Sequence, residues 1–345
     1  MKEQRKPVLV LYDREEEYAF LLTEYIRKHK ELPWDVHTYT AEEELLRAEG
    51  DAPIDVMVVS ERSYREQLSA LRAARTVILS EGGALNRTLN RTDHVQVDKY
   101  LQASQVLQSI LEVYLEMGDA IVPPVQGTGN TRFIGMYSPV RRCMQTSFAL
   151  TFSRMLSERY RTLYLNFEHY VGISELAAEA GSRDLADLLY FLMADGDKFR
   201  LRLQTIVKHR GSLDYVPPMK SGQNLLFVSP REWAGLLRRL EEIGEYDFVI
   251  LDLSESMQGL FDILRSCVKV FTLTKEDKVA QGKLAEYEHI LEAYSYGDVL
   301  QKTCKCMAPK VKRIPEDPEE CTRGEMADFV RKIIRELEEQ KNGLF

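Results

Sequence analysis

The chain has 345 residues, of which 44% are hydrophobic and 29% charged, and its formal net charge is −8 at pH 7. This composition is typical of a folded protein with room for two domains, and the acidic balance argues against broad nucleic-acid binding, which needs a concentrated basic face. No stretch approaches the roughly 20 apolar residues of a membrane-spanning helix, and residues 1–13 lack a signal peptide, so we expect a cytoplasmic protein.

The first third of the chain alternates apolar extended runs with segments of helical periodicity. A continuous apolar run that ends in an acid, such as 7–13, is typical of a buried parallel strand. Strand–helix alternation of this kind predicts a doubly wound parallel sheet over residues 1–117. The expected strands are 7–13, 34–40, 54–60, 76–82 and 94–100, and the expected helices are 15–29, 41–49 and 103–116.

Polar residues at the ends of these strands resemble the active site of a receiver domain of the two-component type. Asp13 follows the first strand, Ser80 ends the fourth and Lys99 ends the fifth, where a receiver carries an acid, a Ser or Thr, and a Lys. The phosphoacceptor position falls on Ser60, whose hydroxyl is a poor substitute for a carboxylate that accepts a phosphoryl group beside magnesium. Tyr12 takes the place of one further acid.

The resemblance therefore implies a pseudo-receiver domain that works as a docking or dimerisation surface. A plain flavodoxin-like α/β domain of unrelated origin is the alternative. Neither interpretation predicts phosphorylation at Ser60, which disfavours a signalling output protein driven by phosphorylation of this domain.

Residues 118–131 concentrate glycine and proline without helical or strand periodicity, so we place a linker there and a second domain at 132–345. The second domain continues the alternation and is again expected to be a parallel sheet covered by helices. Expected strands or short extended pieces are 132–138, 161–168, 213–218, 225–230, 246–256 and 267–277. Expected helices are 146–159, 185–195, 198–209, 231–244, 278–294 and 323–341.

The opening of this second domain, IGMYSPVRRCMQTSFALTFSRML at 134–156, predicts a buried strand, a tight loop and an amphipathic helix. This frame resembles the phosphate-binding loop of the MinD/ParA group of P-loop ATPases, which has the form G-K-G-G-x-G-K-[ST]. In that alignment the signature lysine becomes Val140 and the main lysine becomes Gln145, while hydroxyls remain at Thr146 and Ser147. The loop glycines become Pro139, Arg141, Arg142 and Met144.

These replacements change the chemistry expected of the loop. Glycines let backbone N–H groups curl around phosphates in conformations that other residues avoid, and the lysine places a cation on the outer phosphates. We expect side chains at Arg141, Arg142 and Met144 to crowd the phosphates, and Gln145 to remove the cation. The two arginines could restore the charge, since a guanidinium binds phosphate well.

Two other elements of the ATPase frame are retained. Asn166 and Glu168 end the second strand, at the places of the D-x-D switch acids, and Asp252 ends the strand that matches Walker B. Asp252 could hold Mg²⁺ through water if a nucleotide were bound, whereas the alternative is that such acids simply face solvent. The candidate nucleotide site is therefore vestigial, without an assigned catalytic residue or metal. It comprises Arg141, Arg142, Gln145, Thr146, Ser147, Glu168 and Asp252.

A receiver-like domain followed by a MinD/ParA-like domain resembles the TadZ/CpaE family, whose members act in assembly and polar placement of Tad-type pili and are usually dimers. The resemblance implies a homodimeric, cofactor-free scaffold or localisation protein. It would be recruited to pilus or secretion machinery at a polar or membrane-associated assembly, with indirect membrane contact and without nucleic acid. The alternative is a nucleotide-dependent dimerisation switch that retains Mg-ATP binding or ATPase activity through a reshaped loop.

Three weaker signals each admit two interpretations. The apolar stripe of 323–341 could bind a membrane, as the last helix of MinD does, but its mixed polar face favours packing against the domain. Cys304 and Cys306 could form a metal site with Cys321, but the spacing lacks the paired C-x2–4-C of zinc sites, which favours unpaired thiols. His169 follows Glu168 and could lie near the nucleotide site, but a solvent-exposed loop histidine is the favoured interpretation.

Overall fold

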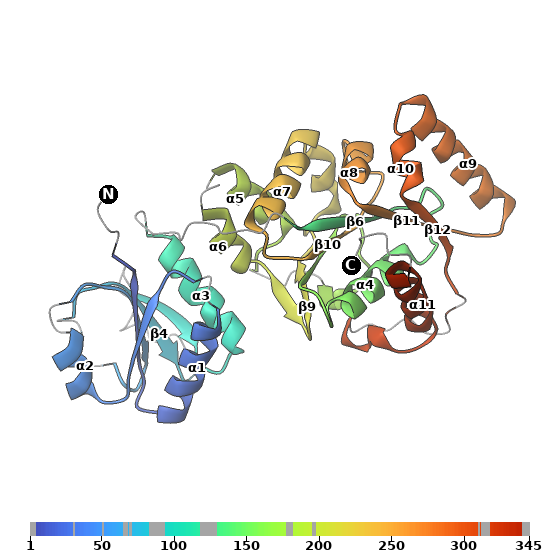
Figure 1. Cartoon of the computed structure of the whole chain (residues 1–345). Coiled ribbons are helices and arrows are strands. Elements are labelled where there is room, and N and C mark those ends of the chain that lie inside the picture. Colours follow the sequence, from blue (N-terminus) through green and yellow to red (C-terminus); the bar gives the residue numbers. More distant parts are fainter. Residues whose placement is uncertain are drawn as a thin grey trace. The chain divides into compact units, whose positions relative to one another are not determined.

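The computed structural model divides the chain into two compact units (Figure 1). Unit 1 comprises Met1–Pro124 and Asp197–Thr205, and unit 2 comprises Val125–Gly196 and Ile206–Phe345. No helix within the described part of the chain is long and apolar enough to cross a bilayer. The expected linker lies mostly outside that part. The structure describes residues 5–29, 32–49, 52–64, 68, 71–82, 94–117, 130–176, 182–194, 198–309, 311 and 318–339.

The core of unit 1 is a five-stranded parallel sheet with the order β2-β1-β3-β4-β5, the flavodoxin-like arrangement. Helices α1 (Glu16–Lys28) and α3 (Ala103–Leu115) pack on one face and α2 (Glu42–Glu49) packs on the other. The predicted parallel sheet is thus present. Its strands are β1 (Val8–Tyr12), β2 (Asp35–Tyr39), β3 (Ile54–Ser60), β4 (Ala73–Ser80) and β5 (His94–Asp98).

A short helix from much later in the chain completes unit 1. Helix α6 (Phe199–Gln204) packs on α3, and its Leu201 is fully buried in the core formed by α1, α3 and the sheet. The side-chain amide of Gln108 donates to the Gln204 carbonyl at 3.3 Å. Apolar burial therefore assigns α6 to unit 1, although its sequence lies among elements of unit 2.

The core of unit 2 is a seven-stranded sheet with the order β12-β11-β6-β10-β7-β9-β8, in which β8 alone runs antiparallel to its neighbour. In this register Asp252 lies beside Met136 on one side and Asn166 on the other, so three strand ends meet at one edge. The strands are β6 (Arg132–Met136), β7 (Thr162–Asn166), β8 (Lys208–Arg210), β9 (Leu213–Val216), β10 (Phe248–Asp252), β11 (Lys269–Thr274) and β12 (Thr303–Met307).

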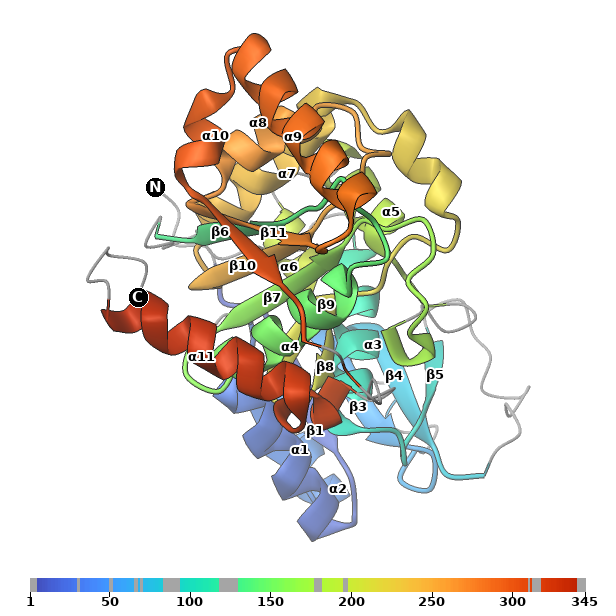
Figure 2. The same ribbon diagram turned by 90° about the vertical axis from the view of Figure 1, so that its right-hand side faces the viewer.

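Helices cover both faces of this sheet (Figures 1 and 2). On one face, α4 (Gln145–Leu156) and α11 (Glu325–Glu339) lie side by side, and the stripe Met326, Val330, Ile333 and Leu337 is buried there. The expectation that this stripe packs against the domain is confirmed. The other helices of unit 2 are α5 (Leu185–Ala194), α7 (Pro230–Ile243), α8 (Leu260–Ser266), α9 (Lys278–Ala293) and α10 (Gly297–Gln301).

Two local predictions for residues 132–345 are wrong. The helix expected at 198–209 ends at Gln204, because the Thr205 hydroxyl bonds back to the Arg202 carbonyl and Gly211, at φ +59, turns the chain into the β8–β9 hairpin. The piece expected to be extended at 225–230 is a 3-10 helix, Gly222–Phe227, followed by α7. Ser229 and Glu232 form a capping box that starts α7 with Pro230 in its first turn.

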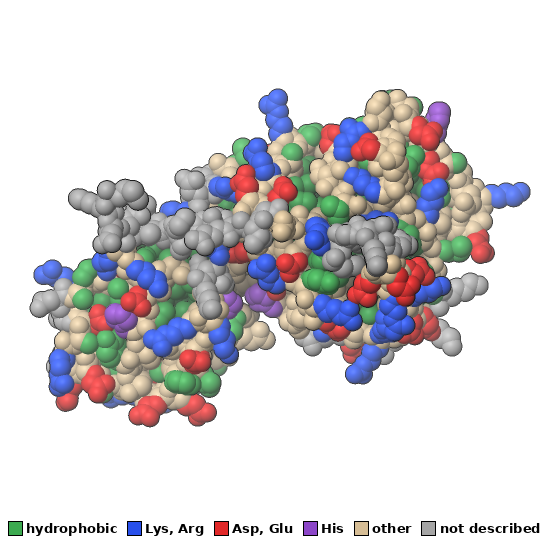
Figure 3. Space-filling model, in the orientation of Figure 1, with side chains coloured by type: hydrophobic (Ala, Val, Ile, Leu, Met, Phe, Trp, Pro, Cys, Tyr) green, Lys and Arg blue, Asp and Glu red, His purple; other side chains and the backbone are tan. Residues whose placement is uncertain are grey.

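Charges of both signs are mixed over the surface in the view of Figure 3, where Lys and Arg alternate with Asp and Glu. That distribution agrees with the formal net charge of −8. In this view the charged side chains are not sorted into a broad basic patch of the kind that a nucleic-acid backbone requires.

Candidate functional site

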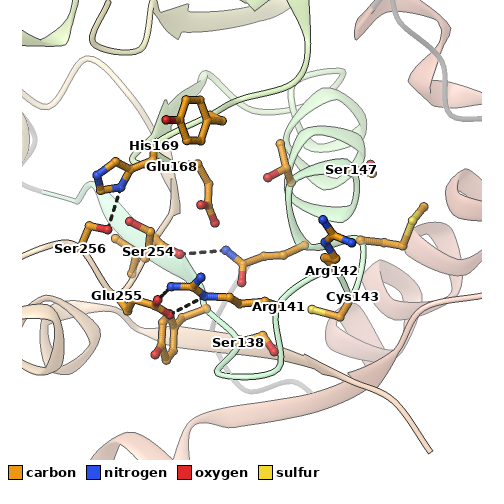
Figure 4. Close-up of a pocket in the computed structure, with 16 residues that line it drawn as sticks. Ser138, Arg141, Arg142, Cys143, Ser147, Glu168, His169, Ser254, Glu255 and Ser256 are labelled. Atoms are coloured by element: carbon orange, nitrogen blue, oxygen red, sulfur yellow. Dashed lines mark hydrogen bonds and ion pairs between the residues drawn. The ribbon is translucent and has the colours of Figure 1, made fainter. Parts of the chain in front are cut away.

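A cavity of about 790 Å³ opens at the carboxyl ends of β6, β7 and β10 in unit 2 (Figure 4). Its walls are formed by residues 137–138, 141–147, 168–170 and 253–256, which follow those three strands or begin α4. Ligands of open α/β sheets bind at this edge, because the loops that follow parallel strands converge there. The cavity therefore includes most of the candidate nucleotide residues expected from the sequence.

The loop between β6 and α4 has a backbone that non-glycine residues seldom adopt. Arg141, Arg142 and Met144 have φ values of +57, +47 and +69, in the left-handed region. Such a conformation costs an L-residue about 1–2 kcal/mol, and strained positions of this kind concentrate at functional sites. Three of the four positions that align with loop glycines thus keep a glycine-like backbone while carrying side chains.

Gln145, at the position of the main lysine, is turned into the protein. Its side-chain amide donates to Asp252 Oδ1 at 2.7 Å and to the Leu253 carbonyl at 2.9 Å. Both side chains are buried, since Gln145 is 9% and Asp252 0% exposed. The neutral amide therefore links the start of α4 to the end of β10, where a lysine would carry a positive charge.

The carboxylate of Asp252 is occupied on both oxygens by neutral donors. Tyr164 OH and Asn166 Nδ2 donate to Oδ2 at 2.9 and 3.0 Å, and Gln145 donates to Oδ1. Burial raises the pKa of Asp252, while the bonds from Gln145, Tyr164 and Thr146 oppose that increase. Asp252 is thus the centre of a closed hydrogen-bond network rather than a solvent-facing acid.

Glu168 lines the cavity, and its pKa differs strongly from the ordinary value of a glutamate. Burial, and secondly the charge of Asp252, raise the pKa of Glu168 to about 7, while Arg141 opposes the shift. The neighbouring Asn166 points away from the cavity, with its Nδ2 on Asp252 and its Oδ1 accepting from the Glu168 N–H at 3.0 Å. The two residues at the D-x-D places therefore have separate roles.

The two arginines of the loop differ in their environment. Arg141 Nε donates to Glu255 Oε2 at 3.0 Å, and the pair is drawn with dashed lines in Figure 4. Arg142 is exposed and forms no hydrogen bond or ion pair with any residue the structure describes. Among the described residues that line the cavity, Arg142 is therefore the uncompensated cation.

Several residues at this site were not expected from the sequence. His169 is half-buried and its Nδ1 lies 2.7 Å from Ser256 Oγ, which corrects the expectation of a solvent-exposed loop histidine. Glu255 and Ser256 follow Asp252 closely in the chain, so their place after a strand end was the signal that could have identified them. Tyr164 gave no such signal, because its apolar strand context hides the hydroxyl.

In unit 1 the expected pocket brings together three of its four residues. Ser60 Oγ donates to Asp13 Oδ1 at 3.1 Å, and Lys99 Nζ lies 2.7 Å from Asp13 Oδ2. Ser80 instead donates to Glu61 Oε2 at 3.2 Å and takes no part. Among the described residues, no group of three or more His, Cys, Asp or Glu side chains is arranged to hold a metal ion.

Lys99 is the centre of this pocket. Its Nζ lies 2.9 Å from Glu15 and 3.2 Å from Glu81 as well as close to Asp13, and the side chain is 2% exposed. Burial alone would lower the pKa of Lys99, but the carboxylates overcome this effect and raise the pKa above its usual value. The lysine thus supplies the positive charge that these acids require.

No protein-family model matches this chain, and no curated protein matches it either. Solved structures do match parts of it. A ParA family ATPase from Chlorobium tepidum TLS is 19% identical over 47% of this chain and 68% of its own, with a TM-score of 0.40. A chain of the MinC:MinD cell division protein complex from Aquifex aeolicus is 12% identical over 50% of this chain and 67% of its own, with a TM-score of 0.38. The septum site-determining protein MinD from Pyrococcus horikoshii OT3, complexed with Mg-ADP, is 14% identical over 62% and 99%, with a TM-score of 0.42.

Proposed function

We propose that the protein is a non-hydrolysing scaffold or localisation protein that uses a nucleotide-binding frame as a structural element. The observation that carries this proposal is the hydrogen bond from Gln145 to Asp252 inside a buried network. A magnesium-bound nucleotide needs a carboxylate free to accept metal-bound water and a cation near the outer phosphates. Here both oxygens of the carboxylate already accept hydrogen bonds from protein groups, and the position of the cation holds a neutral amide.

The residues present therefore do not fit a magnesium-bound nucleotide in this arrangement. Releasing Asp252 would break bonds to three buried donors, Gln145, Tyr164 and Asn166. Leaving buried donors without partners costs about 1–3 kcal/mol for each group. A ligand would have to offset this cost before it gained any favourable contact with the metal.

The pocket of unit 1 supports the same conclusion independently. Ser60 is fully buried, and its hydroxyl is hydrogen-bonded to Asp13 and Ser63. The phosphoacceptor position therefore carries a hydroxyl in place of a carboxylate, and that hydroxyl is not accessible to solvent. Lys99 already forms ion pairs with Asp13, Glu15 and Glu81. In both units the polar groups of the expected site are paired with one another, while the α/β fold is regular. This combination suits a protein whose surfaces bind other proteins.

We propose the partners from the combination of the two units. A flavodoxin-like unit followed by a P-loop-like unit supports a homodimeric, cytoplasmic component of Tad-type pilus or secretion machinery, recruited to a polar or membrane-associated assembly. Membrane contact would then be indirect, since the apolar stripe of α11 is buried against α4.

A second candidate function, a nucleotide-dependent dimerisation switch, is favoured by one specific observation. The left-handed backbone at Arg141, Arg142 and Met144 leaves the first turn of α4 facing the cavity beside the free Arg142. A helix N-terminus attracts anions. In this alternative, ATP and Mg²⁺ would bind only after Gln145 rotated away from Asp252.

Melting of the full chain with and without millimolar Mg-ATP, Mg-ADP and Mg-GTP distinguishes the two functions. The scaffold predicts an unchanged melting temperature, an unchanged dimer fraction in sedimentation, and ATP turnover equal to that of Asp252→Ala. A nucleotide at 100 times its dissociation constant would stabilise the fold by about 2.7 kcal/mol, or several degrees. Such a shift, lost in Arg142→Ala but kept in Arg132→Ala, would establish the switch instead.

A further inference from the structure

Two cysteine side chains lie together on the edge strand of the sheet in unit 2. Cys304 and Cys306 are two residues apart on β12, so both project from the same face of the strand. They are paired in register with Phe271 and Leu273 of β11, whose side chains belong to the core beneath α4 and α11. The two sulfur atoms are 3.6 Å apart, which is direct contact.

The two thiols are not equivalent. Cys304 is half-buried at the margin of the core, whereas Cys306 is 7% exposed. A hydrogen bond from the Cys306 thiol, and secondly the charge of Lys269, lower the pKa of Cys304 to about 7, while the same bond raises the pKa of Cys306. Cys304 is therefore the more exposed and the more acidic of the two thiols, and a second thiol lies beside it.

The remaining cysteines lack this arrangement. Cys143, Cys267 and Cys321 are buried, and the Cys267 thiol donates to the Ile263 carbonyl at 3.3 Å. Burial raises the pKa of Cys143 and, to about 12, that of Cys267. Of the cysteines that the structure describes, Cys304 alone is partly exposed, and a second thiol is in contact with it. Such a pair is the arrangement of a redox-sensitive cysteine.

We propose that Cys304 and Cys306 form a reversible, peroxide-reactive dithiol site. The Cys304 thiolate attacks an oxygen of a hydroperoxide, the O–O bond breaks, and the leaving oxygen takes a proton to become water or an alcohol. Cys304 is then a sulfenic acid. The Cys306 thiol attacks that sulfur, the S–O bond breaks, water leaves, and a disulfide forms, so that two electrons pass from the sulfurs to the peroxide.

The bridge would form between neighbours on one strand, which makes it reducible. Alternate residues of a strand are roughly 6.6 Å apart at Cα, close to the upper end of the range that disulfides span. Formation of the disulfide would therefore bring the Cα atoms of Cys304 and Cys306 closer together. This distorts β12, an edge strand that pairs with β11 alone in the described sheet. Small thiols are expected to reopen a bridge of this kind.

The sequence itself provides a direct test, because Lys305 separates the two cysteines. After the full chain is treated with hydrogen peroxide, alkylated, denatured and digested with trypsin, a bridge keeps the fragments Thr303–Lys305 and Cys306–Lys310 joined. The joined fragment should separate after reduction with dithiothreitol. In the intact chain, bridge formation removes two hydrogen atoms from the mass and leaves a monomeric band on a non-reducing gel.

Single variants assign the roles of the two sulfurs. Cys306→Ser should stop at a sulfenic acid at position 304 that a dimedone reagent traps, whereas Cys304→Ser should consume at least about tenfold less peroxide, since a buried thiol of raised pKa is a slow nucleophile. Cys267→Ser, which removes a buried thiol outside the core beneath α4 and α11, should behave as the native chain does. A bridge to any other cysteine, a disulfide between two chains, or oxidation of Cys304 no faster than that of Cys321 would overturn the proposal.

Discussion

The side-chain amide of Gln145 lies 2.7 Å from Asp252 Oδ1, which joins the first residue of α4 to the last residue of β10. In a P-loop these two positions would hold a lysine and an acid with a nucleotide and its metal between them. In this protein they contact each other directly. These two groups are thus paired with each other at the base of the cavity, and the pairing has measurable consequences.

Gln145→Leu keeps the volume of the side chain but removes both of its donors. Asp252 Oδ1 and the Leu253 carbonyl then lose a buried partner, so we expect a loss of about 1–3 kcal/mol in the free energy of unfolding. Urea denaturation of the two chains measures the difference. Gln301→Leu, at an exposed position on α10, is the matched control and should change stability by less than about 0.5 kcal/mol.

Glu168 should make stability depend on pH. Its pKa is raised from 4.5 to about 7, so the folded chain binds more protons than the unfolded chain between these values. The contribution of Glu168 to stability is therefore fully present below about pH 4.5 and is lost as the pH rises through about 7. Glu168→Gln should remove this part of the pH dependence, so that the variant gains stability relative to the native chain towards pH 8.

Thermal melting at several pH values is the measurement, with Glu241→Gln on the exposed face of α7 as control. A stability difference between native and Glu168→Gln chains that stayed constant across this range would contradict the prediction. The control should show no such pH-dependent difference.

Gly222 is required by the close approach of two backbones. A Cβ at this position would lie 2.4 Å from the Cα and the carbonyl oxygen of His169, which cannot move as a flexible side chain can. We expect Gly222→Ala to displace the 168–170 segment and lower the melting temperature by several degrees. Gly282→Ala in α9 meets nothing within 4 Å and should instead stabilise by about 0.5–1 kcal/mol.

Hydrogen exchange resolved by peptide would show where Gly222→Ala acts. Faster exchange in peptides that contain residues 164–170 is the expected result, with little change in unit 1. If Gly222→Ala and Gly282→Ala gave the same hydrogen-exchange rates in peptides that contain residues 164–170, the close approach of Gly222 to His169 would not determine stability.

Leu201→Ala tests the assignment of α6 to unit 1. Leu201 is fully buried beside α3, so its truncation should cost about 2–5 kcal/mol. Hydrogen exchange should accelerate in α3 and in the strands of unit 1 rather than in β6 or β10. Leu226→Ala, at a position 45% exposed, is the control and should leave exchange in both units unchanged.

The fold could be predicted from the sequence where the pattern was strong. Continuous apolar runs identified β1, β3 and β10 because buried parallel strands leave no room for polar alternation. β12 was missed because its sequence, TCKCM, alternates polar and weakly apolar residues at the edge of the sheet. β8 was missed although Gly211-Ser212 is a known signal for a two-residue hairpin.

The candidate site could be predicted in position but not in its chemistry. Strand ends identified Glu168 and Asp252, yet sequence alone pointed to a free acid at Asp252, whereas its donors come from α4 and β7 through the register of the sheet. The loop was expected to be crowded at Arg141, Arg142 and Met144. The backbone there keeps a left-handed path, which depends on tertiary packing and cannot be read from residue types.

The place of α6 in unit 1 also bears on the order in which the protein is made. Domains usually fold as they leave the ribosome, beginning with the N-terminal one. The first segment of unit 1 ends at Pro124, but Leu201 must be synthesised before its core is complete. During that interval the surface of α3 that later contacts Leu201 is uncovered, so the N-terminal unit is expected to reach its final stability only after part of its neighbour has been translated.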